Sequence, residues 1–210
     1  MPKHPTPRGE HLRRALAQEA ARIMVEQGIE DYGLAKRKAA QRFAVADGAA
    51  LPKNSEIEAA LLQHQRLFGG DAHAESLQAQ RRAALAAMRR LREFEPRLVG
   101  AVLSGTATRH SPVQLHLFAD CAETVAMKLI DAGIAHEVTE KRVRMDPVRV
   151  RAYPGLRFQI GDQPIEVTVF PEDGIRQAPF SPVDGRPMRR ASAPAVEAML
   201  GAEPAETLTA

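Results

Sequence analysis

The chain has a single cysteine, Cys121, among its 210 residues, and it has no tryptophan. One cysteine excludes an internal disulfide and a cysteine-based zinc cluster, and such usage is typical of a reducing compartment. Aromatic residues make up only 4% of the sequence, so the core has to be built mainly from Leu, Val, Ile, Ala and Met. No uncharged apolar run approaches the roughly 18 residues that a transmembrane helix requires. The N-terminal stretch MPKHPTPRGEH also lacks the apolar segment of a secretory signal, and we therefore expect a cytoplasmic protein.

Excess charge of one sign is small as well. The formal net charge of +3 is too low to indicate nucleic-acid binding by itself. Basic residues are nevertheless gathered in clusters, two of which lie on predicted helices: Lys36, Arg37 and Lys38, and Arg82, Arg89 and Arg92. These clusters suit the phosphates of an RNA backbone, and they equally suit a solvated helix face, so both interpretations stay open.

The first half of the chain has the period of helices. Up to Pro96, apolar residues recur at spacings of three and four, and Gly28 and the Gly69-Gly70 pair interrupt the pattern. This spacing predicts four helices, over residues 12–27, 32–43, 55–68 and 73–95.

The second half changes to the period of strands. Residues 97–103 form an apolar run that we interpret as a buried strand, and alternation predicts further strands over 113–118, 136–145, 156–160 and 165–169. A helix is predicted over 122–132, and Gly161-Asp162-Gln163-Pro164 is predicted as a four-residue hairpin loop. The resulting organisation is a helical region (1–96), an α/β core (97–171), and a Pro-rich wrap with a short C-terminal helix (172–210).

One motif stands at the start of this second half. Gly100-Ala101 is followed by Gly105-Thr106 and then by Ser111-Pro112-Val113-Gln114-Leu115. In spacing this resembles the signature of the nucleotidyltransferase superfamily, where a Gly-Ser pair after a strand precedes a second Gly-rich stretch and then Ser-Asp-apolar-Asp-apolar. The resemblance covers roughly residues 97 to 170. It implies an α+β fold in which the N-terminal helical region packs on a small mixed β-sheet of nucleotidyltransferase type.

The resemblance also implies a chemistry. In that superfamily two carboxylates on one strand and a third on a neighbouring strand hold Mg²⁺, which bridges the phosphate oxygens of the nucleotide. Here Pro112 and Gln114 occupy the first two positions, while Glu166, in the apolar-acid-apolar sequence Ile165-Glu166-Val167, matches the third. His116 lies two residues beyond Gln114 on the same strand face and would be a substitute ligand or an acid–base partner of Glu166. A polar strand histidine bound to a carboxylate or to water is the simpler alternative.

Candidate site residues follow from this comparison. Glu166, Gln114 and His116 are the catalytic candidates, and Glu166 is the metal ligand. The candidates for binding the nucleotide are Gly100, Gly105, Thr106, Arg109 and Ser111. A Gly-Thr turn that connects two elements without binding any ligand is the alternative for the last four.

Three functions remain open at this level. A divergent protein that binds nucleotide or RNA, with catalysis lost or altered, agrees best with the missing strand acids. An active Mg²⁺-dependent enzyme would move a nucleoside monophosphate from a nucleoside triphosphate to an acceptor. A protein-interaction scaffold would use the helical half to bind a partner.

Overall fold

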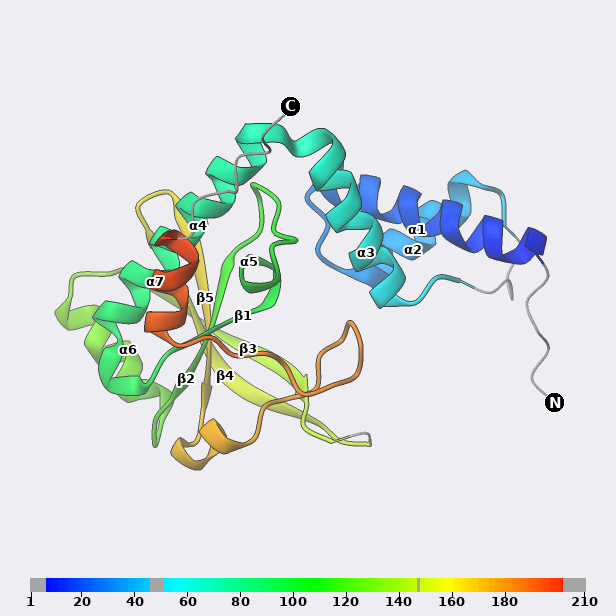
Figure 1. Cartoon of the computed structure of the whole chain (residues 1–210). Helices are drawn as coiled ribbons and strands as arrows, with labels where there is room; N and C mark the ends of the chain where they lie inside the picture. The colour runs from blue at the N-terminus through cyan, green and yellow to red at the C-terminus, as the bar shows by residue number, and fades with distance from the viewer. Residues whose placement is uncertain (1–6, 46–50, 147, 202–210) are drawn as a thin grey trace. The chain divides into compact units, whose positions relative to one another are not determined.

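The computed structural model describes residues 7–45, 51–146 and 148–201, and it has an α+β fold with a five-stranded mixed sheet (Figure 1). The predicted fold class is therefore confirmed. The helices are α1 (Pro7–Gln27), α2 (Tyr32–Arg42), α3 (Asn54–His64), the π-helix η1 (Gln65–Gly69), α4 (Gly70–Arg90), η2 (Arg92–Phe94), α5 (Gly100–Ser104), α6 (Ala122–Asp131), η3 (Glu172–Arg176) and α7 (Ala193–Gly201). The strands are β1 (Arg97–Val99), β2 (Val113–Phe118), β3 (His136–Arg144), β4 (Val150–Ile160) and β5 (Gln163–Phe170). None of the helices in these residues has the length and apolarity needed to cross a bilayer.

The chain divides into two compact units. Unit 1 comprises Met1–Ser76, Gly105–Ser111 and Ser181–Arg186. Unit 2 comprises Leu77–Ser104, Pro112–Phe180 and Pro187–Ala210. The motif found in the sequence is therefore divided, because Gly100 and Gln114 belong to unit 2 whereas the turn from Gly105 to Ser111 belongs to unit 1.

Unit 1 is a helical unit with α1 packed against both α2 and α3. Its core is formed by one stripe of each helix, as the spacing in the sequence predicts, and small residues on these stripes let the helix backbones approach closely. The fully buried members are Leu16, Ala20, Ala21, Ile23, Ala35, Ala39 and Ile57. Helix α2 begins at the cap residue Asp31, whose Oδ1 accepts a hydrogen bond from the Leu34 backbone nitrogen at 2.7 Å.

Unit 2 contains the sheet, in the order β1-β2-β5-β4-β3. Strands β2 and β5 are parallel, and the other neighbouring pairs are antiparallel. One face of the sheet is the apolar core predicted from the alternation, where Leu115, Val167 and Leu156 are at most 2% exposed. Helix α6 contacts β4, α5 contacts β1 and β2, and α7 contacts β1. The opposite face carries the polar residues of the same strands.

Two local predictions are wrong, and the strand predicted over 156–160 is too short, because β4 begins at Val150. The apolar run 97–103 is not one strand, because β1 ends at Val99 and the chain turns into α5 at Gly100, whose φ is +71°. A short apolar run does not distinguish a buried strand from a buried helix. The hairpin between β4 and β5 has a two-residue turn, Gly161-Asp162, with Gly161 at φ +58°, instead of the four-residue loop predicted.

Candidate functional site

The polar face of the sheet brings several of the predicted residues together. We use this name for the side of the sheet that carries Gln114 and His116 on β2, Glu166 and Thr168 on β5, and Arg157 on β4. Gln114 lies directly opposite Glu166, and His116 lies opposite Thr168, on the parallel pair β2 and β5. Arg157 lies opposite Glu166 on the other side. Since side chains alternate along a strand, all five point to the same face.

Gly100 is in contact with this face. Its positive φ favours glycine, and a Cβ built at this position would collide with Gln114 Oε1 and stand 3.2 Å from Gln114 Cδ. The absence of a side chain at Gly100 therefore leaves the space that the Gln114 amide occupies. The structure thus joins the first glycine of the motif to Gln114, and Gln114 to Glu166.

The carboxylate of Glu166 is held by two cations. Lys141 Nζ donates to Glu166 Oε2 at 3.0 Å, and Arg157 Nη2 donates to Glu166 Oε1. Burial by itself would raise the pKa of Glu166, but the hydrogen bonds from Arg157 and Lys141 outweigh burial and lower the pKa below its usual value. Glu166 is therefore ionised at neutral pH, and each of its oxygens already accepts a charged donor.

His116 is buried, with 4% of its surface exposed. Its Nδ1 accepts a hydrogen bond from Arg190 Nε at 3.1 Å, and its ring meets the Phe170 ring edge-on at 4.7 Å between centroids. Burial, together with the positive charges of Arg190 and Lys141, lowers the pKa of His116 to about 3. The imidazole is therefore neutral, and because Nδ1 accepts, its proton is on Nε2. The polar partner of His116 is thus an arginine, where the sequence suggested a carboxylate.

Arg190 reaches the polar face from the C-terminal segment. Ala191 pairs with Leu98 of β1 through two backbone hydrogen bonds of 2.8 and 2.9 Å, which extends the sheet by one short segment. The Arg190 Nη1 atom donates to the carbonyl oxygens of Gly174 and Ile175, at 2.9 and 3.2 Å.

The guanidinium of Arg190 also lies near two aromatic rings. Its Cζ is 5.0 Å from the centroid of Phe118 and 5.4 Å from that of Phe170. Burial, with the charge of Arg97 nearby, lowers the pKa of Arg190 to about 10, so it remains a cation at neutral pH. Arg190 therefore adds a third positive charge to the polar face, beside those of Lys141 and Arg157.

The donors on this face do not fit a magnesium ion. Mg²⁺ is held by hard carboxylate oxygens together with water or phosphate. Across the described ranges, no three His, Cys, Asp or Glu side chains gather as a metal site needs. Glu166 is a single carboxylate between two cations, and Gln114 beside it offers a neutral amide. An excess of cationic donors over carboxylates is the chemistry of a site for an anion.

The second glycine-rich stretch of the motif lies in unit 1. There Gln65 Nε2 donates to the backbone oxygens of Thr106 and Ala107, both at 3.0 Å. Thr106 and Ser111 are 3% and 4% exposed, while the Arg109 side chain is exposed and donates to His110. Gln65 therefore fixes the backbone of this turn within the helical unit. A role of Gly105, Thr106, Arg109 and Ser111 toward a nucleotide stays a prediction.

The two basic clusters predicted on the helices lie in different units. In unit 1, Lys38 Nζ donates to Gln27 Oε1 at 2.6 Å, and burial lowers the pKa of Lys36. In unit 2, Arg89 forms an ion pair with Glu197 at 2.7 Å, while Arg82 and Arg92 are exposed. RNA binding by either cluster stays a prediction.

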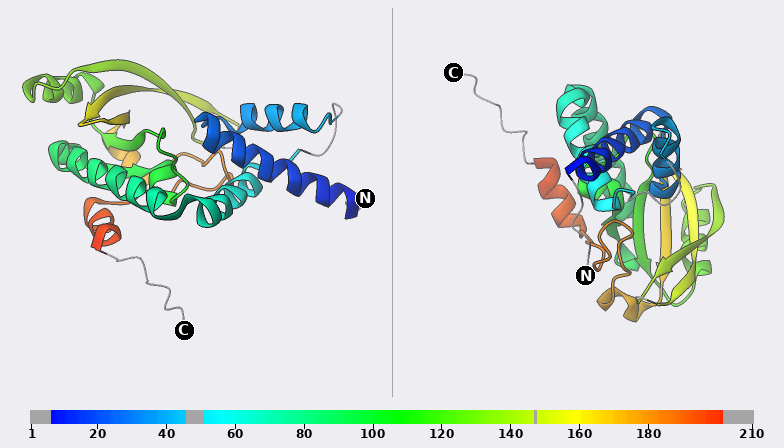
Figure 2. Two further views of the ribbon diagram at one scale, coloured as in Figure 1. Left: turned by 90° about the horizontal axis from the view of Figure 1, so that it is seen from above. Right: turned by 90° about the vertical axis from the view of Figure 1, so that its right-hand side faces the viewer.

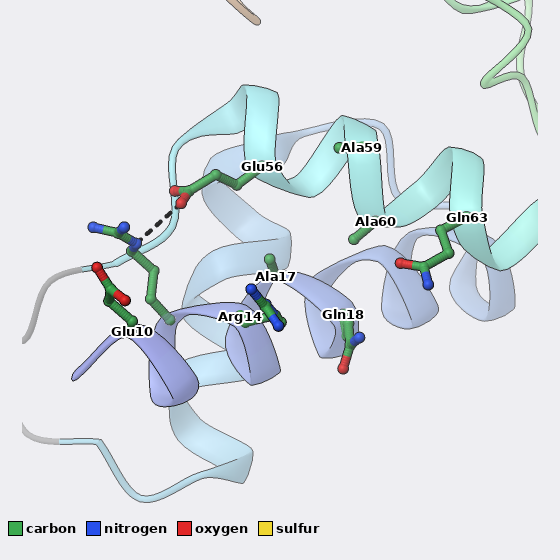
Figure 3. Close-up of a pocket in the computed structure, with 9 residues that line it drawn as sticks. Glu10, Arg14, Ala17, Gln18, Glu56, Ala59, Ala60 and Gln63 are labelled. Atoms are coloured by element: carbon green, nitrogen blue, oxygen red, sulfur yellow. Dashed lines mark ion pairs between the residues drawn. The ribbon is translucent and has the colours of Figure 1, made fainter. Parts of the chain in front are cut away.

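Each of the two units contains a concave site. In unit 2, a cavity of about 260 Å³ lies beside the rings of Tyr153 and Phe170. Arg151 and Asp173 also line it. A groove of about 440 Å³ lies between α1 and α3 of unit 1 (Figure 3). Arg13 forms an ion pair with Glu56 at 3.0 Å in this groove. The other lining residues are Glu10, Arg14, Ala17, Gln18, Ala59, Ala60 and Gln63. Its two acidic and two basic side chains balance, so its charge does not select a ligand.

Arg157 was not among the residues predicted from the sequence. The alternation Leu156-Arg157-Phe158 places it on the face opposite to the core, and the length of the following turn decides which residue of β5 it meets.

Comparisons with protein-family models, with curated proteins and with solved structures gave no match to this chain.

Proposed function

We propose that this chain is a divergent nucleotidyltransferase-like protein that binds a nucleotide on the polar face of its sheet and has lost metal-dependent transfer. The observation that carries the proposal is that Gly100 lies against the Gln114 side chain, and that Gln114 lies opposite Glu166 in the sheet. These residues come from three separate segments, and each occupies a position that the superfamily signature marks. An arrangement of this kind is expected if the geometry of a nucleotide site persists.

The charges of the polar face support a phosphate-bearing ligand. Lys141, Arg157 and Arg190 contribute three positive charges against the one negative charge of Glu166. The side chains of Lys141 and Arg157 are 48% and 54% exposed, so they are accessible while Glu166 keeps them in place. Ammonium and guanidinium groups bind phosphate oxygens through charge-assisted hydrogen bonds. Tyr153 lies opposite Lys141 in the sheet, and the cavity that Tyr153 lines leaves room for the nucleoside.

The same contacts argue against catalysis. Transfer of a nucleotidyl group relies on metal ions that neutralise the charge developing on the phosphate oxygens. To bind such an ion, Glu166 would have to release both Lys141 and Arg157, and Gln114 would offer only an amide oxygen. We therefore assign Glu166 the role of positioning the two cations that bind the phosphate.

The substitution Glu166→Gln distinguishes the two roles. If Glu166 positions cations, removing its charge leaves Lys141 and Arg157 more attractive to phosphate, and the affinity for a nucleoside triphosphate rises roughly two- to fivefold. Calorimetric titration with ATP, GTP, CTP and UTP, with and without Mg²⁺, measures this change. Glu123→Gln on α6 removes an exposed carboxylate of the same unit and is the matched control.

Each outcome decides between the alternatives. A higher affinity without release of pyrophosphate supports binding without catalysis. Pyrophosphate release that requires Mg²⁺ and is abolished by Glu166→Gln would instead establish an active enzyme. The absence of binding for every nucleotide at low salt would refute the proposed function altogether.

A further inference from the structure

The hairpin of β3 and β4 extends beyond the rest of the sheet. The two strands pair from His136 opposite Phe158 to Arg144 opposite Val150. Strand β5, however, pairs with β4 only from Gly155 to Ile160. Residues 140–146 and 148–154 therefore form a two-stranded ribbon, hereafter the ribbon, at the turn end of the long strands β3 and β4 seen in Figure 2.

Contacts hold the residues on either side of position 147, at the turn end of the ribbon. Met145 is buried against Phe118 and Phe170, and its backbone nitrogen donates to the Arg149 oxygen at 3.2 Å. Asp146 Oδ1 accepts hydrogen bonds from the backbone nitrogens of Val148 and Arg149, at 2.9 and 2.7 Å. These contacts restrain the backbone at Met145, Asp146, Val148 and Arg149, which reduces the conformational entropy lost when neighbouring side chains bind a partner.

The ribbon concentrates the positive charge of the protein. Its five basic residues, Lys141, Arg142, Arg144, Arg149 and Arg151, face only two acidic ones, Glu140 and Asp146. The resulting formal charge of +3 equals that of the whole chain of 210 residues, so the remaining residues are neutral as a set. Lys141 is bound to Glu166. In the part of the chain that the structure covers, the four arginines are exposed and form no ion pair.

Protection of a free sheet edge does not account for this composition. Exposed edge strands carry charges, most often lysine, that discourage pairing with other chains, so edge protection would not favour arginine over lysine. Here five of seven charged residues are basic, and four of these five are arginines. The planar guanidinium donates two parallel hydrogen bonds to a phosphate, which lysine does not. The composition therefore matches a row of phosphates better than it matches edge protection.

We propose that the ribbon binds the phosphodiester backbone of a nucleic acid through Arg142, Arg144, Arg149 and Arg151. Arg142 and Arg144 point to one face of the ribbon, and Arg151 points to the other, so the ribbon offers cations on both sides. Contacts of this kind fix a protein on the backbone without reading the base sequence. The four arginines do not contact Glu166, and three of them lie outside the nucleotide site proposed above, whereas Arg151 also lines the cavity assigned there to the nucleoside.

The salt dependence of binding tests this assignment quantitatively. Each phosphate contact contributes about −0.9 to the slope of log K against log salt for a DNA duplex and about −0.7 for a single strand. Replacing the four arginines by glutamine is therefore expected to reduce the magnitude of the slope by about 3 to 4 on a DNA duplex. A short RNA duplex, the DNA duplex of the same sequence and a single strand are titrated in parallel. The control variant replaces Arg14, Arg66, Arg186 and Arg189, four exposed arginines outside the ribbon and outside both helical basic clusters, and so has the same net charge.

Each result of these titrations either supports or overturns the proposal. A loss of slope confined to the ribbon variant supports the proposal, and the probe that the wild type binds most tightly at one common salt concentration identifies RNA or DNA as the preferred ligand. An equal loss in the control variant would mean that only the overall charge matters, and it would overturn the assignment. Absence of nucleic-acid binding, or binding to anionic vesicles alone, would overturn it as well. Circular dichroism and the melting temperature verify that each variant is folded.

Discussion

Lowering the pH from 7 to 5 is expected to destabilise the protein through His116. Its folded-state pKa is about 3, whereas an unfolded chain titrates near the ordinary value of 6.5. Between these two values the unfolded chain binds a proton that the folded chain does not. The stability contributed by the neutral, buried imidazole is therefore complete above pH 6.5 and is lost as the pH falls toward 3.

The size of the effect follows from the difference in pKa. Each unit corresponds to about 1.4 kcal/mol, so His116 removes about 2 kcal/mol from the free energy of unfolding at pH 5. The whole loss is on the order of 5 kcal/mol below pH 3. A loss of this size is a large fraction of the free energy of unfolding of a typical domain, which is about 5–15 kcal/mol. The structural cause is that His116 is buried against Arg190 and the Phe170 ring, and among the described residues no carboxylate forms an ion pair with it.

The matched variant is His116→Gln, which keeps an oxygen that accepts the Arg190 hydrogen bond but does not titrate. Urea unfolding at pH 7 and pH 5 gives the loss of stability for each protein. The wild type is expected to lose about 2 kcal/mol more than the variant. Groups such as Glu166 and His73, whose pKa values are also lowered, are present in both proteins, and their contributions cancel.

A direct titration is available from the NMR signals of the histidine ring. The His116 resonances should not shift between pH 7 and 5. An equal loss of stability in the wild type and in His116→Gln, or a His116 midpoint near 6.5, would show that the imidazole is not buried against Arg190 as described.

Two further sets of substitutions test the motif and the turn. Gly100→Ala is expected to cost about 1–2 kcal/mol for its positive φ, plus the collision with Gln114, and Gln114→Ala should relieve only the second part. Strictly additive losses in this double-mutant cycle, measured by urea unfolding, would contradict the contact. In unit 1, Gln65→Leu removes the donor to the carbonyls of Thr106 and Ala107, at a cost of about 1–3 kcal/mol, and Gln65→Glu should cost more at pH 7 because its carboxylate would face both oxygens. A Gln65→Glu protein as stable as Gln65→Leu would be inconsistent with these hydrogen bonds.

The partner of Glu166 illustrates where sequence reasoning was insufficient. A four-residue loop from Gly161 to Pro164 would place Gln159 opposite Glu166, whereas the observed two-residue turn places Arg157 there. A two-residue error in the turn thus replaces a guanidinium by an amide beside the carboxylate. Gly161-Asp162 is the kind of pair that two-residue hairpin turns favour, and it was the clue available in the sequence.

The sequence by itself determined the elements and the faces of the sheet. The change of period near Pro96 separates helices from strands, and the alternation along β2 and β5 puts Gln114, His116 and Glu166 on the polar face, because side-chain direction in a strand depends only on position along the chain. The sequence did not determine the secondary structure from Arg97 to Leu103, because a short buried strand and a short buried helix have the same apolar pattern.

Only the tertiary structure decided what those side chains meet. The pairing of Ala191 with β1 brings Arg190 to His116 across 74 positions of the sequence. The pairing of β3 and β4 brings Lys141 to Glu166. Contacts over such separations depend on strand order and register, which no local pattern encodes. For the same reason the glycine turn from Gly105 to Ser111, adjacent to the sheet in sequence, is held by Gln65 in the helical unit.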